Sequence, residues 1–540
     1  MKKLLAMLTV SALAAATFSV NSVAATVPPG TTLAKEQTLV RGNGTEPASL
    51  DPQKVEGVPG SNVLVDLFEG LITQDSNGNV IPGQAESWTV SDDNKLFTFK
   101  IRDTAKWSNG DPVTAHDFVY AFQRAVDPET ASRYAWYMEI PTIINASAII
   151  RGEKPVDTLG VRAVDDKTFQ VKLEKPVPYF IKMLAHTTMF PVHQKTIEKY
   201  GDDWTKPGNM VSNGAYTLKE WTVNERIVLE RNPNYWNDKE TVINQVTYLP
   251  ITSQTAELNR YKAGEVDMTS TIPLEHYKSL KESIPEEIKT TPYLGTYYYE
   301  FNTQKPPFDD ARVRKALSYA IDRNAITQYV LGQGQLPAFT MTPSSVSGFT
   351  PPDLPYSHLS QSELNAKAKK LLEEAGYSQS NPLKVTLLYN TLDSHKKIAI
   401  AISQMWKPLG VQVTLENKEW KTYLDSKDEG DFEVARGGWI GDYNEASSML
   451  DLKTSTHGQN DGKYSSKEFD AIMAKSRTVT SDEERAELYK QAEEILAKDM
   501  PLAPIYQYVT SRLVKPEVGG YPMNNVEDNI YTRELYIKKL

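Results

Sequence analysis

Apolar and polar residues alternate in several stretches of this chain, and a period of two is typical of strands with one buried face. The clearest case is LFTFKIR at residues 96–102, where Phe97, Phe99 and Ile101 alternate with polar side chains. Three further stretches are predicted strands: residues 37–41, 227–229 and 242–249. Two alternating arms around an Asp-Asp turn predict a hairpin over residues 158–173.

Two helices are predicted in the same half of the chain. The turn Ser-Asn-Gly-Asp-Pro at residues 108–112 is followed by Thr114, which can cap a helix. Phe118, Ala121 and Phe122 would share one face of that helix, so they are predicted core residues. A short helix followed by a turn is predicted over residues 66–73.

Helical periodicity dominates the second half. Residues 309–330 have the period of a helix, and Ser360 with Glu363 forms a capping box that opens another, closed by Gly376. Strands at 383–387 and 411–415 flank a predicted helix at 395–406. Ser481 caps a further helix, which leads to a nearly all-apolar strand at 502–509. This strand–helix–strand order predicts an α/β unit with a mainly parallel sheet.

The amino terminus has the pattern of a secretory signal. Lys2 and Lys3 precede a short apolar run, residues 4–16, and Ser-Val-Ala at residues 22–24 predicts cleavage after Ala24. The alternative is a membrane anchor, but the apolar run is shorter than the ~20 residues that a span needs. No later stretch is long and apolar enough to span a membrane. Residues 1–24 are therefore predicted to be a removable signal peptide.

Charge and cysteine content narrow the functional classes. Removing residues 1–24, which hold two lysines and no acids, changes the net charge from −10 to −12. A mildly acidic chain argues against binding of nucleic acid or anionic membranes. The chain has no Cys, which excludes disulfides, thiol nucleophiles, thiolate metal sites and a lipidated Cys anchor. A secreted protein without such an anchor stays near its membrane only if an outer membrane confines it, so we expect a periplasmic protein.

Motifs for catalysis or metal binding are missing from the sequence. None of the seven histidines stands at ligand spacing from a second histidine and a carboxylate. There is no G-x-S-x-G motif, no Walker loop and no complete G-x-G-x-x-G. We therefore expect no catalytic residue, no metal and no cofactor. A periplasmic hydrolase of peptides or glycans remains a distant alternative.

The stretch from Ala85 to Arg124, AESWTVSDDNKLFTFKIRDTAKWSNGDPVTAHDFVYAFQR, resembles a signature of the family 5 periplasmic solute-binding proteins. The resemblance runs over almost the whole chain. It implies an α/β fold of the type II periplasmic-binding-protein class, with two large α/β lobes joined by a two-segment hinge, plus an inserted lobe. Lobe I would comprise residues 25–68, 194–294 and 510–540, lobe II residues 69–193 and lobe III residues 295–509.

The resemblance also implies a function. Members of this family carry peptides, nickel and similar solutes to ABC importers, and this chain is most similar to the oligopeptide binders and their murein-peptide-binding relatives. It would trap short peptides between lobes I and III as a monomer and deliver them to a membrane permease with cytoplasmic ATPases. A protein selective for murein tripeptide is the nearer alternative. Haem, nickel and sugar oligomers are further candidate solutes.

The segment DFEVARGGWIGDYNE, residues 431–445, is the main candidate binding site. Arg436, Trp439 and Asp442 fall within seven residues, and read alone they fit an ordinary core strand with a surface ion pair. By resemblance, Asp442 receives the α-ammonium of a peptide, with Arg436 and Trp439 beside it. Gly438 and Ile440, together with Trp439, would offer a strand edge to the peptide backbone.

Other candidate residues are assigned by resemblance only. A second strand edge would come from Glu56, Gly57 and Val58; read alone, Glu56 is a solvated loop acid. Four further residues match positions that line the cleft in the oligopeptide binders: Tyr134, Tyr298, Glu300 and His395. Without the resemblance, Tyr134 and Tyr298 would be interpreted as core residues and His395 as a surface residue. His395 and Arg436 would present cations to the peptide carboxylate.

Three departures from the broad oligopeptide binders limit this assignment. Those proteins have a Cys pair where this chain has Gly295 and Ile440, and a Lys where it has Leu331. They have an Arg where this chain has Lys427, which keeps the charge but loses the planar bidentate fork. The first two departures favour the murein-peptide branch, whereas Lys427 does not, because a doubly acidic murein peptide should favour Arg.

Overall fold

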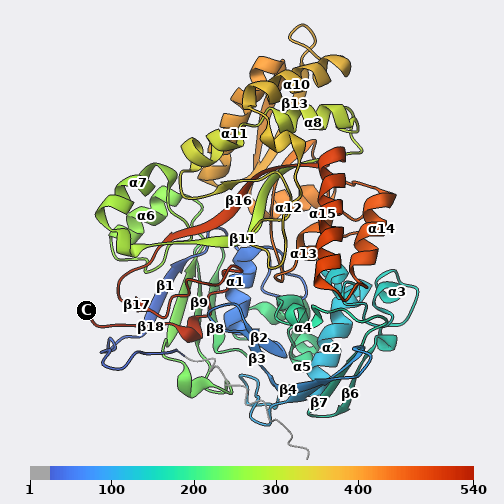
Figure 1. Ribbon diagram of the computed structural model, residues 1–540. Coiled ribbons are helices and arrows are strands. Elements are labelled where there is room, and N and C mark those ends of the chain that lie inside the picture. Colours follow the sequence, from blue (N-terminus) through green and yellow to red (C-terminus); the bar gives the residue numbers. More distant parts are fainter. Residues whose placement is uncertain (1–24) are drawn as a thin grey trace, which may run out of the picture.

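The computed structural model describes residues 25–540, so the predicted signal peptide lies outside the described residues. Three main sheets and two short strand pairs form within this range. Figure 1 shows the two smaller main sheets at the base and the six-stranded sheet above them. No helix in this range combines the length and the apolar character needed to cross a membrane.

The first sheet has four strands, in the order β1 (Thr38–Gly42), β10 (Gln245–Leu249), β9 (Arg226–Arg231) and β8 (Tyr216–Thr222). β1 runs parallel to β10, and the other neighbours are antiparallel. Helix α1 (Val58–Leu67) contacts β8, and two more helices lie beside the sheet, α6 (Gln254–Lys262) and α7 (Leu274–Ser283).

The second sheet is antiparallel throughout, in the order β4 (Ala85–Val90), β5 (Leu96–Ile101), β7 (Thr168–Lys172) and β6 (Val161–Asp165). Helix α2 (Ala115–Val126) packs against β6 and β7. Phe118 and Phe122 reach Phe169 of β7 at ring-centroid distances of 5.7 and 5.3 Å, which explains the apolar face of this helix. Three shorter helices and one 3-10 turn belong to the chain around this sheet: α3 (Ala146–Ile150), α4 (Phe180–Met183), α5 (Gln194–Tyr200) and the turn Ala135–Met138.

The third sheet has six strands, in the order β12 (Leu336–Pro337), β16 (Leu502–Leu513), β11 (Ile288–Phe301), β15 (Val434–Ile440), β13 (Leu383–Asn390) and β14 (Val411–Lys418). Its helices include α8 (Ala311–Tyr319), α10 (Gln361–Glu374), α11 (Asp393–Trp406), α12 (Trp420–Asp428), α13 (Ser447–Leu450), α14 (Lys467–Ser476) and α15 (Asp482–Asp499). Both long strands, β11 and β16, pass from this sheet towards the first one (Figure 1).

The prediction of a mainly parallel sheet is wrong. Only β13 runs parallel to its neighbours, β14 and β15, whereas β11 is antiparallel to both β15 and β16. The parallel part is the strand–helix–strand unit that the sequence pattern revealed. The antiparallel part comes from the two long strands β11 and β16; the pattern located residues 502–509 of β16 but not its antiparallel pairing with β11.

Two helix predictions are also corrected. Residues 309–330 do not form one helix, because α8 ends at Tyr319 and a new turn begins at α9 (Arg323–Ala325). Asp322 caps that turn through the backbone N–H of Ala325, at 2.9 Å. In the second case, the short helix predicted at 66–73 is the end of α1, and β2 (Ile72–Gln74) follows it and pairs with β3 (Val80–Pro82).

Most other local predictions are confirmed. Thr114 and Asp117 form a capping box, as do Ser360 and Glu363, and Ser481 caps α15. The hairpin predicted over residues 158–173 is β6 and β7. The apolar strand predicted at 502–509 is part of β16, which continues to Leu513.

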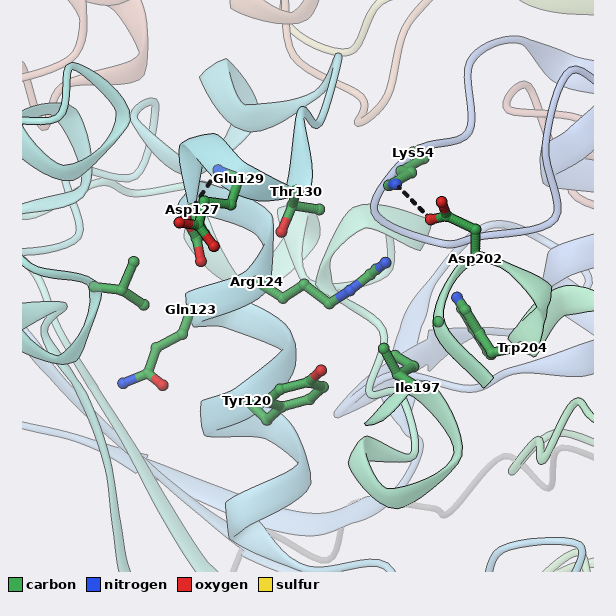
Figure 2. Close-up of a pocket in the computed structure, with 12 residues that line it drawn as sticks. Lys54, Tyr120, Gln123, Arg124, Asp127, Glu129, Thr130, Ile197, Asp202 and Trp204 are labelled. Carbon is green, nitrogen blue, oxygen red and sulfur yellow. Dashed lines mark hydrogen bonds and ion pairs between the residues drawn. The ribbon is translucent and has the colours of Figure 1, made fainter. Parts of the chain in front are cut away.

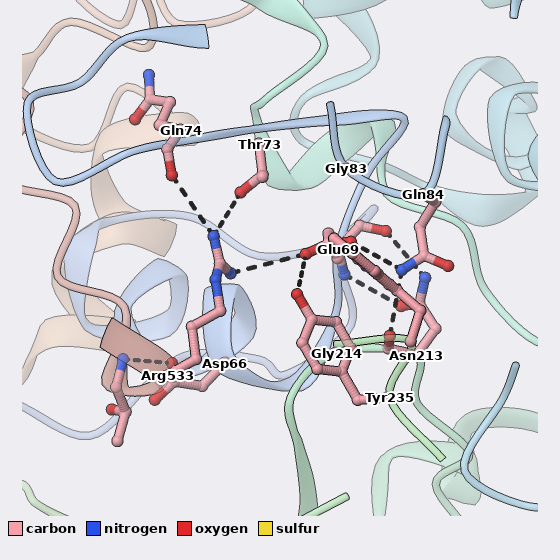
Figure 3. Close-up of polar contacts among 12 residues, drawn as sticks. Asp66, Glu69, Thr73, Gln74, Gly83, Gln84, Asn213, Gly214, Tyr235 and Arg533 are labelled. Carbon is pink, nitrogen blue, oxygen red and sulfur yellow. Dashed lines mark hydrogen bonds and ion pairs between the residues drawn. The ribbon is translucent and has the colours of Figure 1, made fainter. Parts of the chain in front are cut away.

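A buried polar network ties the carboxyl-terminal segment to the passage between the first two sheets (Figure 3). The Glu69 carboxylate accepts hydrogen bonds from Tyr235 Oη at 2.6 Å, Trp236 Nε1 at 2.6 Å and Gln84 Nε2 at 2.9 Å. Arg533 Nη1 lies 3.9 Å from the same carboxylate. Segments far apart in sequence are thus joined at one point, where the chain leaves α1 and enters the second sheet's unit. The last strand pair, β17 (Val518–Gly519) with β18 (Tyr536–Ile537), lies close to this end of the chain.

Candidate functional site

A cavity of about 450 Å³ is walled by all three units of the fold. The first sheet's unit contributes residues next to α1, the second sheet's unit contributes Tyr134 and the turn at 185–187, and the third contributes residues around β15, α11 and α12. Twelve of the thirteen candidate residues line it: Glu56, Gly57, Val58, Tyr134, Tyr298, His395, Lys427, Arg436, Gly438, Trp439, Ile440 and Asp442. The exception is Glu300, which lies behind the wall.

Strand β15 turns an open edge towards this cavity. On one side it pairs with β11 along its whole length, from Val434 to Ile440. On its other side, β13 pairs only with its first two residues, Val434 and Ala435. Gly438, Trp439 and Ile440 line the cavity, so their backbone can pair with an added strand.

Asp442 lies two residues beyond the open edge. Its backbone N–H donates to Ser448 Oγ at 2.7 Å. Its carboxylate lies 3.2 Å from Nε2 of His186, a residue of the second sheet's unit, and both side chains are nearly buried. Asp442 therefore presents a negative charge at one end of the open edge.

Arg436 is the cation at the other end of the edge. Its Nη2 donates to Tyr508 Oη at 2.6 Å, its Nη1 lies 3.4 Å from Asn390 Oδ1, and its guanidinium lies 4.9 Å from the centre of the Tyr297 ring. No carboxylate in residues 25–540 forms an ion pair with it, and its buried Nε has no hydrogen-bond partner among these residues. A buried cation with only neutral partners is a strong candidate for binding an anion.

His395 does not supply the second cation that we expected. It lies in the first turn of α11, is 6% exposed, and its Nδ1 is 3.5 Å from Tyr297 Oη. Burial and the charge of Arg436 lower the pKa of His395 well below its usual value. At neutral pH it therefore offers a hydrogen bond and no charge.

Lys427 is already neutralised within the protein. Its Nζ lies 2.9 Å from Asp461 and 3.4 Å from Glu300. Glu300 also binds Lys453, and the side chains of that pair are each 1% exposed. Burial alone would raise the pKa of Glu300, but the ammonium groups of Lys453 and Lys427 outweigh this effect and lower it. Glu300 thus stabilises the wall of the cavity through its ion pairs without lining the cavity itself.

Aromatic side chains cover the Asp442 end. Tyr134 stacks on His186 with ring centroids 5.0 Å apart and lies nearly parallel to Trp439 at 6.3 Å. Tyr298 lines the cavity beneath β15, and a Cβ at Gly437 would meet its ring at 2.2 Å, so only Gly fits there.

Glu56 and its neighbours close the cavity from the first sheet's unit. Gln459 Nε2 donates to Glu56 Oε1 at 2.8 Å, across 403 residues of sequence. Gly57 has a φ of 83°, and a Cβ there would lie 2.7 Å from the Trp420 ring. Burial and the nearby Asp428 carboxylate raise the pKa of Glu56 to about 7. The two large units therefore touch directly at this point.

Sequence reasoning missed several residues of the site. His186, Tyr508, Asn390, Trp420 and Gln459 all face the cavity. Each is a single polar or aromatic residue with no local motif around it. No pattern in the sequence marks them, because they join the site only through contacts with distant segments.

A second hollow, of about 310 Å³, lies beside α2 (Figure 2). Arg124 reaches into it, but its guanidinium already binds both oxygens of Asp51, at 2.6 and 2.7 Å, and Gln53 at 2.9 Å. Lys54 lies 3.6 Å from Asp202. The cations here have protein partners, so this hollow is the weaker candidate. Among residues 25–540, no cluster of three or more His, Asp or Glu is arranged to hold a metal ion.

Comparisons with known proteins bear on this site. Residues 79–461 match the model for the middle region of bacterial extracellular solute-binding proteins, family 5. The chain is 53% identical over 520 residues to the periplasmic oligopeptide-binding protein OppA of Escherichia coli (strain K12), and the alignment covers 96% of each chain.

Two solved structures of relatives show a similar fold. The OppA of Haemophilus influenzae in complex with the peptide RPPGFSPFR is 49% identical with a TM-score of 0.91, over 94% of this chain and 100% of that one. The murein tripeptide binding protein MppA of Escherichia coli is 50% identical, with a TM-score of 0.93 over 94% of this chain and 100% of that one. Its unliganded open form gives a TM-score of only 0.68, over 95% and 99% of the two chains. The arrangement of this chain is therefore much closer to that of the peptide complex than to the open form.

Proposed function

The chain belongs to family 5 of the bacterial extracellular solute-binding proteins, and we propose that it binds short peptides in this cavity for an ABC importer. The observation that carries the proposal is the edge of β15. It offers unpaired backbone groups, with the Asp442 carboxylate beyond one end and the Arg436 guanidinium at the other. A peptide has the complementary parts: a backbone that can add as a strand, an α-ammonium and an α-carboxylate. None of these contacts depends on side-chain sequence.

The spacing of the two charges favours three or four residues. A Cβ at Gly438 would lie 2.8 Å from Nη2 of Arg436, so the guanidinium lies beside that residue. Asp442 follows four residues later, which corresponds to roughly 13 Å at about 3.3 Å per residue. An extended peptide covers at most about 3.3–3.6 Å per residue, so three or four residues fit between the charges.

The capture mechanism would be closure of two lobes about the long strands. We propose lobe I as residues 25–68, 194–294 and 510–540, lobe II as 69–193 and lobe III as 295–509. The boundaries at 294 and 509 fall within β11 and β16, next to the register shift between Pro292 and Thr296. The protein would act as a periplasmic monomer without catalytic activity and would pass its ligand to a permease with cytoplasmic ATPases.

The charge of Lys427 bears on the murein tripeptide alternative. A murein tripeptide carries an additional carboxylate, which needs an additional cation in the site. Lys427 is the candidate, but it already pairs with Asp461 and Glu300. This pairing favours ordinary short peptides, and it leaves murein tripeptide as an outcome that the experiment must be able to detect.

Mass spectrometry of protein purified from the periplasm tests the function directly. Denaturation releases whatever has co-purified, and fragmentation identifies it. We expect peptides of mixed sequence, mainly three or four residues long. A single species containing diaminopimelate would favour murein tripeptide instead. If no peptide is released and none binds on titration, the proposal is wrong, and cleavage of an added peptide would indicate a hydrolase.

Peptide affinity is expected to depend on pH through Glu56. Its ordinary pKa is 4.5, and burial and Asp428 raise it to about 7 in this closed arrangement. Between pH 4.5 and pH 7, Glu56 is protonated in the closed form, whereas a solvent-exposed Glu56 is ionised. Closure is therefore favoured as pH falls below 7 and disfavoured as pH rises through 7, with a change of up to about tenfold in affinity between pH 6 and pH 8.

Calorimetric titrations at pH 6, 7 and 8 measure this dependence. The E56Q substitution leaves the other charged and titratable groups of this region unchanged: Asp428, Asp461, Lys427, Arg133 and Tyr134. E56Q should depend less steeply on pH than the wild type and retain the slope due to Asp428 and Glu527, whose pKa values burial raises to about 6 and about 7, whereas E282Q, on an exposed side chain of α7, should follow the wild type. Equal slopes for wild type and E56Q would contradict the prediction.

A further inference from the structure

His186 is a buried histidine that no motif singled out, and it lies against the candidate ammonium receptor. It belongs to the turn that follows α4, in the second sheet's unit, whereas Asp442 belongs to the loop after β15. The two side chains are 12% and 9% exposed, and His186 Nε2 lies 3.2 Å from Asp442 Oδ1. Both residues line the cavity.

The orientation of the His186 ring is fixed on all sides. The backbone N–H of Thr188 donates to Nδ1 at 3.3 Å, so in the neutral ring the proton lies on Nε2, which faces Asp442. One face of the ring stacks on Tyr134 at 5.0 Å, and Tyr137 packs against it at 4.5 Å. Tyr137 Oη donates to the backbone oxygen of Met183 at 3.0 Å, which holds that ring in turn. The imidazole is therefore held in place before any ligand arrives.

Two side chains can orient the Asp442 carboxylate, the imidazole of His186 and the hydroxyl of Tyr134. His186 is the only cationic or imidazole side chain within 4 Å of the Asp442 carboxylate in residues 25–540. The backbone of Asp442 is fixed by Ser448, but that bond leaves the side chain free to rotate. The His186 donor on Oδ1 and the Tyr134 hydroxyl together restrict this rotation, and a carboxylate with two donors still has lone pairs for an ammonium.

We propose that His186 is the positioning residue for recognition of the peptide amino terminus: it holds Asp442 so that one oxygen faces the α-ammonium. The inference rests on the proposed function. It adds His186 as the residue that sets the selectivity of the protein for peptides with a free amine. It also makes the ammonium site a product of two units, complete only when the turn at 185–187 lies against the loop after β15. Lys182 makes a second contact between these segments, with its Nζ 3.4 Å from the backbone oxygen of Asn444.

A purely structural role for His186 predicts something different. If the pair with Asp442 only fastened two units together, its loss would weaken all peptides alike. If His186 positions Asp442, its loss should weaken only ligands that carry a free α-ammonium. The ratio of affinities for a free tripeptide and its N-acetylated form therefore separates the two roles.

The experiment compares variants by calorimetric titration with Ala-Ala-Ala and N-acetyl-Ala-Ala-Ala. In H186L we expect about a tenfold loss for the free peptide and no change for the acetylated one. H186Q keeps an N–H donor and should recover most of that loss. H193Q is the matched control, because His193 is also buried and lies 3.0 Å from an aspartate, Asp111, but does not line the cavity. It should leave the affinity ratio unchanged.

A double variant makes the test sharper. If His186 acts through Asp442, H186L with D442N should bind the free peptide no more weakly than D442N alone. An equal loss for both peptides in H186L, or additive losses in the double variant, would overturn the proposal while leaving the peptide-binding function intact. Wild-type protein that binds neither peptide would overturn the proposed function and the inference together.

Discussion

The D442N variant is expected to bind a tripeptide with a free amino terminus at least about 30-fold more weakly than the wild type. Asp442 carries the negative charge at one end of the β15 edge, and its side chain is 9% exposed. In the variant, an α-ammonium placed there would lose its charged partner at a nearly buried position. Removing one partner of a buried, hydrogen-bonded charge pair typically costs about 2–5 kcal/mol of binding free energy. Calorimetric titration of wild type and variant with Ala-Ala-Ala measures the change.

Titration with an N-acetylated tripeptide provides the control for this measurement. An N-acetylated tripeptide has no ammonium, so its weaker binding should be nearly equal in wild type and D442N. A matched variant, D482N, changes an aspartate that is 86% exposed at the start of α15 and should bind like the wild type. Equal affinity of wild type and D442N for the free peptide would show that the ammonium is bound elsewhere.

The E300Q variant is expected to lose about 3–5 kcal/mol of unfolding free energy. Glu300 and Lys453 form an ion pair in which each side chain is 1% exposed, and Lys427 lies 3.4 Å from the same carboxylate. The amide of Gln leaves two buried ammonium groups without that negative charge. Breaking a buried pair by removing one partner typically costs this much, because the remaining charge stays desolvated. Urea denaturation of both proteins at pH 7 measures the difference.

Two comparisons check the cause. The double variant E300L with K453M removes both charges of the pair and should be clearly more stable than E300Q. Because the lysines lower the pKa of Glu300, its contribution to stability is present above the ordinary value of 4.5 and is lost as pH falls through the lower folded value. The gap between wild type and E300Q should therefore narrow in acid. A gap that is constant with pH would exclude this explanation.

Local elements of the fold could be predicted because their signals are local. The capping boxes at Thr114 and Ser360 each need only residues three positions apart, and the alternation in β5 needs only its neighbours. The single helix predicted at 309–330 was wrong, because Asp322 and Arg323 start a new turn there. Arg323 binds backbone oxygens of Ser318 and Ile321, contacts that a helical period does not reveal.

Sheet topology could not be predicted in the same way. The apolar pattern located the parallel strands β13 and β14, since a helix joins them directly. The antiparallel strands β11 and β16 pair across about 200 residues, from Ile288 with Leu513 to Glu300 with Leu502. The apolar run at 502–509 marks a buried strand, but it carries no information on the partner of that strand.

The sequence by itself determined which chemical groups are present: an aspartate, an arginine and a tryptophan on one short segment, with no cysteine and no catalytic motif. The tertiary structure decided which of those groups remain free to act. The charge of Lys427 is neutralised by ion pairs with Asp461 and Glu300. Burial beside Arg436 keeps His395 neutral. His186 contacts Asp442, which lies 256 positions later in the sequence. Charge state and orientation depend on burial and on distances of a few ångströms, and these are set by segments that only the folded chain brings together.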